Sequence, residues 1–84
     1  MDLENRIKYF LQKSSYKPNY LWTPQNYLNG FLVKIPNYRG TMMQDFQNIM
    51  SNYCTIGYFK LEQSSVDMPS YRLTELGYQD LILK

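Results

Sequence analysis

Residues 56–78 read IGYFKLEQSSVDMPSYRLTELGY, and this stretch decides the predicted fold. Residues 58–62 are aromatic-rich and alternate at their end between apolar and polar side chains, which predicts a strand. The polar residues 63–70 predict a loop, and residues 71–73 predict the returning strand of a hairpin. Thr74 is the expected cap of a final helix that carries several leucines.

Three helices are predicted before this hairpin. The first spans residues 3–13 with Asp2 as its cap, and the second spans 24–33 after Thr23 and a proline at the first helical position. The third, over residues 40–53, has the clearest amphipathic pattern of the chain. Its apolar side consists of Met42, Met43, Phe46, Ile49, Met50 and Tyr53.

Two helices joined by a short glycine-containing turn and followed by a hairpin resemble the winged helix-turn-helix family. The run Tyr-x-Leu-Thr-x-x-Gly over residues 71–77 is similar to the passage from the second wing strand into the last helix of many bacterial winged-helix regulators. The resemblance covers about residues 21–83. It implies an α+β winged helix-turn-helix fold with three helices, a two-stranded β-hairpin wing and a C-terminal helix. It also implies that residues 40–53 form the recognition helix and residues 63–70 the wing tip.

Length and composition predict one globular domain over residues 1–84, with 44% hydrophobic and 19% charged residues. Histidine is absent and Cys54 is the only cysteine, which excludes zinc fingers, intrachain disulfides and histidine-based catalysis. No phosphate loop, dinucleotide fingerprint or metal spacing is present, so we expect no enzyme, no cofactor and no metal. No apolar run is long enough for a membrane span, and we expect a soluble, cytoplasmic protein.

The outward side of the predicted recognition helix carries Thr41, Gln44, Asn48 and Ser51. Amide side chains can hydrogen-bond adenine in the major groove, and hydroxyl side chains serve either base type. Arg39 precedes the helix and is expected to reach a phosphate or a guanine edge. The further candidate phosphate contacts are Lys17, Lys34, Lys60 and Arg72. The sequence therefore predicts a small transcriptional regulator that binds double-stranded DNA.

The charge pattern limits this prediction. Residues 1–40 carry six basic and two acidic residues, whereas residues 41–84 carry three basic and five acidic ones. No lysine or arginine lies between Gly40 and Phe59, so we expect weak nonspecific DNA binding and a need for two half-sites. We therefore predict a homodimer that forms through the terminal helices, with the apolar residues 81–83 in its interface.

Two alternatives stay open at this stage. Polar residues on the third helix are also what any solvated helix face displays. The second alternative is a winged-fold protein-interaction module that does not bind DNA, such as an accessory protein of a phage or plasmid. Its test is whether four aromatic residues of the connecting segments form an exposed patch. These residues are Tyr16, Tyr20, Trp22 and Tyr38.

Overall fold

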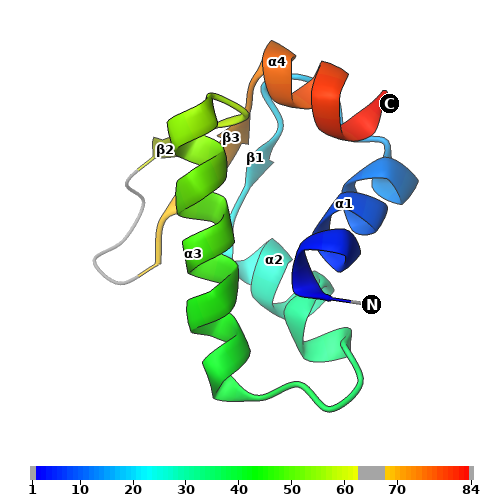
Figure 1. The fold of residues 1–84 in the computed structure, drawn as a ribbon, viewed down its shortest axis with the longest axis vertical. Helices are drawn as coiled ribbons and strands as arrows, with labels where there is room; N and C mark the ends of the chain where they lie inside the picture. The colour runs from blue at the N-terminus through cyan, green and yellow to red at the C-terminus, as the bar shows by residue number, and fades with distance from the viewer. Residues whose placement is uncertain (1, 63–67, 84) are drawn as a thin grey trace.

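The computed structural model describes residues 2–62 and 68–83, which form four α-helices and a three-stranded antiparallel sheet (Figure 1). The helices are α1 (Leu3–Ser14), α2 (Pro24–Gly30), α3 (Gly40–Ile56) and α4 (Glu75–Gly77). The strands are β1 (Leu21–Trp22), β2 (Phe59–Glu62) and β3 (Ser70–Leu73). A 3-10 turn, η1 (Leu32–Lys34), follows α2, and a π-helical turn, η2 (Tyr78–Ile82), continues α4. The predicted α+β class is confirmed, and the arrangement is compatible with a winged-helix-like fold.

The predicted helix starts are confirmed by their capping hydrogen bonds. The Asp2 carboxylate accepts from the Asn5 N–H at 2.8 Å, which satisfies a free donor at the start of α1. The Thr23 hydroxyl accepts from the Asn26 N–H at 3.4 Å, and a proline occupies the first turn of α2. These local bonds explain why both starts could be predicted from sequence alone.

The helix ends differ from the prediction at two places. The third helix does not end at Tyr53 but continues to Ile56, because Gly57 is the residue that adopts the left-handed conformation, with φ of 104°. The second helix ends at Gly30 instead of residue 33, because Phe31 leaves the helical conformation and the chain tightens into η1. The predicted single last helix is divided into α4 and η2.

The sheet contains a strand that the sequence did not predict. β1 pairs antiparallel with β3, opposite β2, which gives the strand order β1-β3-β2. Trp22 lies opposite Tyr71, and Leu21 lies opposite Arg72. The expected two-stranded hairpin is therefore one part of a three-stranded sheet. Most of the wing tip expected at residues 63–70 falls on 63–67, outside the described residues.

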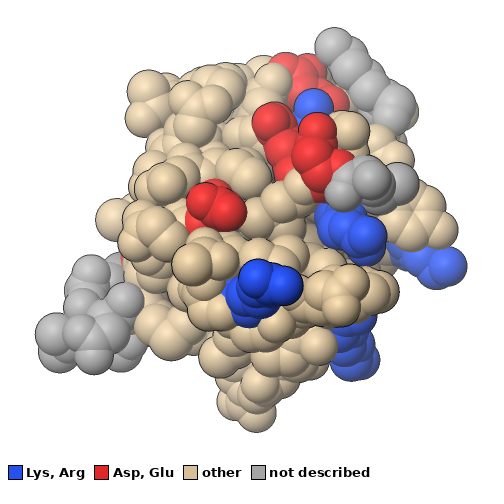
Figure 2. Space-filling model, turned by 60° about the horizontal axis from the view of Figure 1, so that its bottom comes forward, with Lys and Arg blue, Asp and Glu red and all other residues tan. Residues whose placement is uncertain are grey.

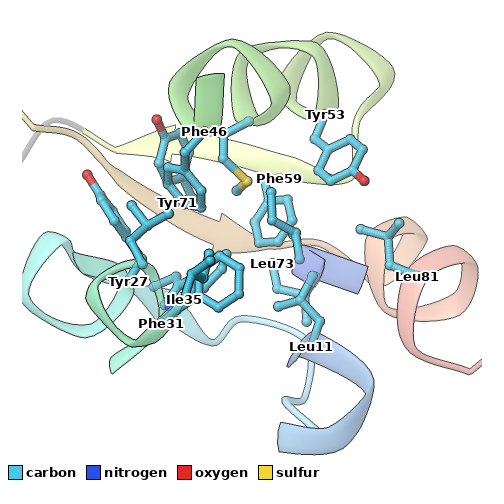
Figure 3. Close-up of a cluster of buried hydrophobic side chains, with 14 residues drawn as sticks. Leu11, Tyr27, Phe31, Ile35, Phe46, Tyr53, Phe59, Tyr71, Leu73 and Leu81 are labelled. Atoms are coloured by element: carbon cyan, nitrogen blue, oxygen red, sulfur yellow. The ribbon is translucent and has the colours of Figure 1, made fainter. Parts of the chain in front are cut away.

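Aromatic side chains dominate the core, and the close-up in Figure 3 shows them pointing toward one another from the helices and the sheet. Trp22 is fully buried and stacks on Phe10, with ring centroids 5.7 Å apart. Phe46 of α3 meets the edge of Trp22 at 5.5 Å and the ring of Tyr27 at 4.8 Å. The sheet therefore holds α2 and α3 through one continuous aromatic cluster.

The methionine side of α3 is part of this core, as its spacing predicted. Met50 is completely buried, and Met42 and Met43 pack partly buried against the cluster. At the opposite end, the hydroxyl of Tyr53 donates to the Glu4 carboxylate at 3.0 Å and ties α3 to α1. These contacts fix one side of α3 and leave the other side free for solvent or a ligand.

Candidate nucleic-acid interface

The outward side of α3 has the composition expected from its periodicity. All four predicted contact residues are exposed, and they lie opposite Phe46, Met50 and Tyr53, which are buried. These exposed residues are Thr41, Gln44, Asn48 and Ser51. Their spacing of three and four residues places them in one stripe along the helix. The only charged residue within α3 is Asp45, which is also exposed.

Two amides on this stripe orient each other. The Nε2 of Gln44 donates to the Oδ1 of Asn48 at 3.0 Å, across one helical turn. Within the described residues, this bond leaves the Oε1 of Gln44 and the Nδ2 of Asn48 for an outside partner. One acceptor and one donor are complementary to the N6 donor and the N7 acceptor that adenine presents in the major groove. The pair is thus held ready for a partner at little further entropic cost.

Basic side chains flank α3 at both ends. Arg39 precedes the helix and is exposed, and its side chain makes no capping bond. Lys34 is exposed at the end of η1, and Lys60 is exposed on β2, which begins just after α3. Most blue side chains in Figure 2 lie in the lower right part of the face, and the red ones lie above them. In chain order, exposed cations therefore precede and follow the uncharged polar side of α3.

Arg72 is placed differently from the other predicted phosphate contacts. Its Nε and Nη2 donate to the two carboxylate oxygens of Glu62, the latter at 3.0 Å, and its Nη1 donates to the Asn19 carbonyl at 2.8 Å. The hydrogen bonds from Arg72 lower the pKa of Glu62, and those to Glu62 raise the pKa of Arg72. The guanidinium thus joins β3 to β2 and to the segment before β1.

Lys17, the remaining candidate, lies away from this pairing. It is exposed, and its Nζ lies 5.7 Å from the centre of the Tyr78 ring. This distance is within the range of a cation–π contact. Lys17 therefore belongs to the end of the molecule where α1 ends and η2 begins.

The four aromatic residues of the connecting segments do not form the exposed patch that a protein-interaction surface requires. Trp22 is fully buried, and Tyr16, Tyr20 and Tyr38 are each half-buried. Tyr16 and Tyr20 stack on each other with centroids 3.8 Å apart. Burial, with a further contribution from Tyr16, raises the pKa of Tyr20 to about 12. Because Trp22 is fully buried, it is unable to stack on a base.

The described residues offer little reactive chemistry. Cys54 is partly buried, and burial raises the pKa of its thiol, which disfavours the nucleophilic thiolate. Within residues 2–62 and 68–83, no three acidic or sulfur ligands gather to hold a metal ion. The same residues include no helix with the length and apolar character needed to cross a bilayer.

The terminal segments predicted as a dimer interface pack on each other within one protomer. The Nε2 of Gln12 in α1 donates to the Leu81 carbonyl at 3.0 Å, and the Leu81 side chain is in the protomer's own core. Leu83 is 63% exposed and Tyr9 is 56% exposed. Together with Leu76 of α4, these are the large apolar side chains that the terminal segments expose among the described residues.

A concave surface lies between α1 and the segment from Gly30 to Ile35. Its volume is about 590 Å³, and its basic residues Arg6, Lys13 and Lys34 come from both segments. This groove was not predictable from the sequence, because Arg6 and Lys13 lie far from Lys34 along the chain. The available indication was their spacing of seven residues, which places Arg6 and Lys13 on one side of α1.

No protein-family model, no curated protein and no solved structure matches the chain.

Proposed function

We propose that this chain is a small winged-helix protein that binds double-stranded DNA, with α3 in the major groove. The sheet order β1-β3-β2 and a helix that directly precedes β2 are compatible with this family's arrangement. α3 has 17 residues and is therefore about 25 Å long, enough to cross the groove of B-form DNA. The observation that carries the proposal is its uncharged, exposed stripe with a preorganised pair of amides.

The backbone contacts assigned to this proposal are Lys34, Arg39 and Lys60. All three are exposed, and none has a described carboxylate oxygen within 4.0 Å, although the charge of Lys60 also acts on Glu62. Arg72 is given a positioning role, because its guanidinium is engaged by Glu62 and Asn19. Three phosphate contacts correspond to a slope of about −2.7 for log affinity against log salt in one protomer. Affinity then falls about 40-fold between about 50 mM and 200 mM salt.

This electrostatic contribution is small, so a second copy supports specific binding in the proposal. A homodimer on two half-sites doubles the slope to about −5. The exposed Leu83 and Tyr9 are the surface proposed for that contact, since Leu81 is used inside the protomer. The role as a transcriptional regulator follows from specific binding at a palindrome.

The test is fluorescence anisotropy with a duplex selected from a random library, titrated at several salt concentrations. Arg39→Gln removes a proposed phosphate contact, and it should weaken binding and reduce the salt slope by about 0.9 for each copy bound, which is about 1.8 for the homodimer. Lys8→Gln is the matched control, since Lys8 lies on α1 and pairs with Glu4 at 3.8 Å. It should leave the slope near that of the unmodified chain. Equal slopes for both variants, or no binding at low salt, would contradict the proposal and favour the protein-interaction alternative.

A further inference from the structure

The groove between α1 and the segment from Gly30 to Ile35 has an aromatic floor. Phe31 and Ile35 are buried, at 6% and 8% exposure, and Phe10 is half-buried beside them. The rings of Phe10 and Phe31 lie 4.9 Å apart. Phe10 also stacks on the fully buried Trp22, at an interplanar angle of 13°. The floor is thus held by the core and needs no rearrangement before a flat apolar group contacts it.

The walls of the groove are basic. Arg6 and Lys13 come from α1, and Lys34 comes from η1 on the other side. No acidic residue lines the groove, and none of these cations has a carboxylate within 4.0 Å in the described part of the chain. The Lys13 ammonium lies 5.7 Å from the centre of the Tyr9 ring.

The acidic groups of α1 are engaged elsewhere. The Glu4 carboxylate accepts from the Tyr53 hydroxyl at 3.0 Å and pairs with Lys8 at 3.8 Å. Asp2 caps the start of the helix. The positive charge around the groove is therefore not neutralised by the nearest carboxylates on the same helix.

We infer that this groove binds a small aromatic anion, with the ring against the floor of Phe10 and Phe31 and the anionic group on one or two of the cations Arg6, Lys13 and Lys34. The volume of about 590 Å³ lies within the range that drug-sized ligands occupy. An apolar floor with a few convergent charged groups is the usual composition of such sites. Three cations and no carboxylate favour an anion over a neutral or cationic ligand by charge complementarity.

The anionic group can be a phosphate, as in a mononucleotide, or a carboxylate, as in an aromatic acid. Both present oxygen acceptors that guanidinium and ammonium groups bind through charge-assisted hydrogen bonds. The inference shares Lys34 and Tyr9 with the proposed DNA-binding homodimer, but it does not rest on that function, and its test contains no DNA. If the DNA-binding proposal fails its test, the result of the groove titration can still be interpreted, and the reverse also holds.

The first experiment titrates the full chain with four probes and follows backbone amides and the single indole N–H signal by NMR. The probes are adenosine monophosphate, 1-naphthoate, neutral 1-naphthylmethanol and inorganic phosphate. Trp22 is the only tryptophan and lies directly behind Phe10, so its indole signal reports on the groove floor. At least one aromatic anion should bind about tenfold more tightly than the neutral ring and than phosphate, with shifts at Ser14, Gly30 and Lys34.

The ratio of the affinities for the two aromatic anions shows whether the anionic group of the ligand is a phosphate or a carboxylate. Tighter binding of the nucleotide assigns a phosphate ligand, and tighter binding of the naphthoate assigns an aromatic acid. Equal binding of the neutral ring would overturn the inference, because the cations would then contribute nothing. Binding of phosphate as tight as that of either aromatic anion would also overturn the inference, because the basic residues would then attract any anion and the aromatic floor would contribute nothing.

The second experiment blocks the groove. Gly30 lines it and has no positive φ, and a Cβ added there meets no atom within 4 Å. The Cβ of Gly30→Leu is therefore unobstructed, and we expect the rest of its side chain to take groove volume. Gly40→Leu is the matched control, since its Cβ also meets nothing within 4 Å and Gly40 does not line the groove. Gly30→Leu should weaken binding of the preferred anion at least about tenfold, while Gly40→Leu leaves it unchanged.

A pair of charge variants keeps the inference testable if Gly30→Leu fails to fold. Lys13→Gln removes a cation of the groove, and Lys8→Gln removes a cation from the same helix outside it. The first should weaken binding about three- to tenfold, and the second should leave it unchanged. Equal effects of the two variants would overturn the proposed site.

Discussion

Gly77, the last residue of α4, lies against the backbone of Tyr58, which connects α3 to β2, and we predict that Gly77→Ala strongly destabilises the fold. A Cβ at this position would lie 2.2 Å from the Tyr58 carbonyl oxygen and 3.0 Å from a methyl group of Leu73. Ordinary contact begins at 3.4 Å, so α4 and the Tyr58 backbone must separate by about 1 Å. The obstacle is backbone, which cannot rotate away as a side chain can.

The separation also strains the hydrogen bonds of this junction. The Thr74 N–H donates to the Tyr58 carbonyl at 3.0 Å, and the Thr74 hydroxyl lies 2.9 Å from the same oxygen. Overpacking costs about 1–3 kcal/mol, and each lost hydrogen bond adds about 1 kcal/mol. We expect Gly77→Ala to lower the free energy of unfolding by about 3–5 kcal/mol. A chain of 84 residues has a total of about 4–13 kcal/mol, so the effect is easily measured.

Urea unfolding, followed by tryptophan fluorescence and far-UV circular dichroism, measures this difference. Gly30→Ala is the matched control, because it makes the same chemical change where nothing lies within 4 Å. It should leave the stability unchanged or raise it by up to about 1 kcal/mol, through helix propensity and a more restricted unfolded chain. Equal unfolding midpoints for the two variants would refute the close approach of α4 to Tyr58.

Three further predictions concern pH, the cap of α4 and the ion pair of the sheet. Burial raises the pKa of Tyr27 to about 12 and also raises that of Tyr71, so the unfolded chain loses these protons first, near pH 10. The free energy of unfolding in urea should therefore fall above about pH 10, by up to about 1.4 kcal/mol per pH unit for each buried tyrosine. A free energy of unfolding that stays constant from about pH 9 to about pH 11 contradicts this. Thr74→Val removes the hydroxyl that accepts from the Gly77 N–H at 3.0 Å, and it should lower the free energy of unfolding in urea by about 1–2 kcal/mol. Thr74→Ser keeps the cap and is the control. Equal losses of stability in the two variants argue against the cap. Glu62→Gln weakens the interaction that holds Arg72 and should steepen the salt slope of DNA binding by about 0.9 for each copy bound, whereas an unchanged slope shows that Arg72 stays with the sheet.

Local features of the fold were predictable from the sequence. Asp2, Thr23 and Thr74 each cap a helix with the expected side-chain hydrogen bond, because a cap depends on residues only three positions away. The apolar and polar sides of α3 also follow from its own periodicity. The hairpin of β2 and β3 was predicted for the same reason, since its strands lie close together along the chain.

Features that depend on distant segments were not predictable. β1 has two residues and no periodicity of its own, and it exists because Trp22 pairs with Tyr71 across the chain. Arg72 was predicted as a phosphate contact, but its partners Glu62 and Asn19 are brought to it only by the sheet. The groove beside α1 is likewise assembled from two segments that the fold alone places together.

The central claim, that α3 reads duplex DNA, is tested most directly by NMR of the chain with a selected duplex. The account predicts that the side-chain amide signals of Gln44 and Asn48 shift on titration, together with backbone amides near Thr41 and Ser51. Lys60 on β2 should shift with them, because it is assigned to the adjacent phosphates. Shifts confined to α1 and η1, or none on α3 at a DNA concentration that saturates binding, would contradict the account.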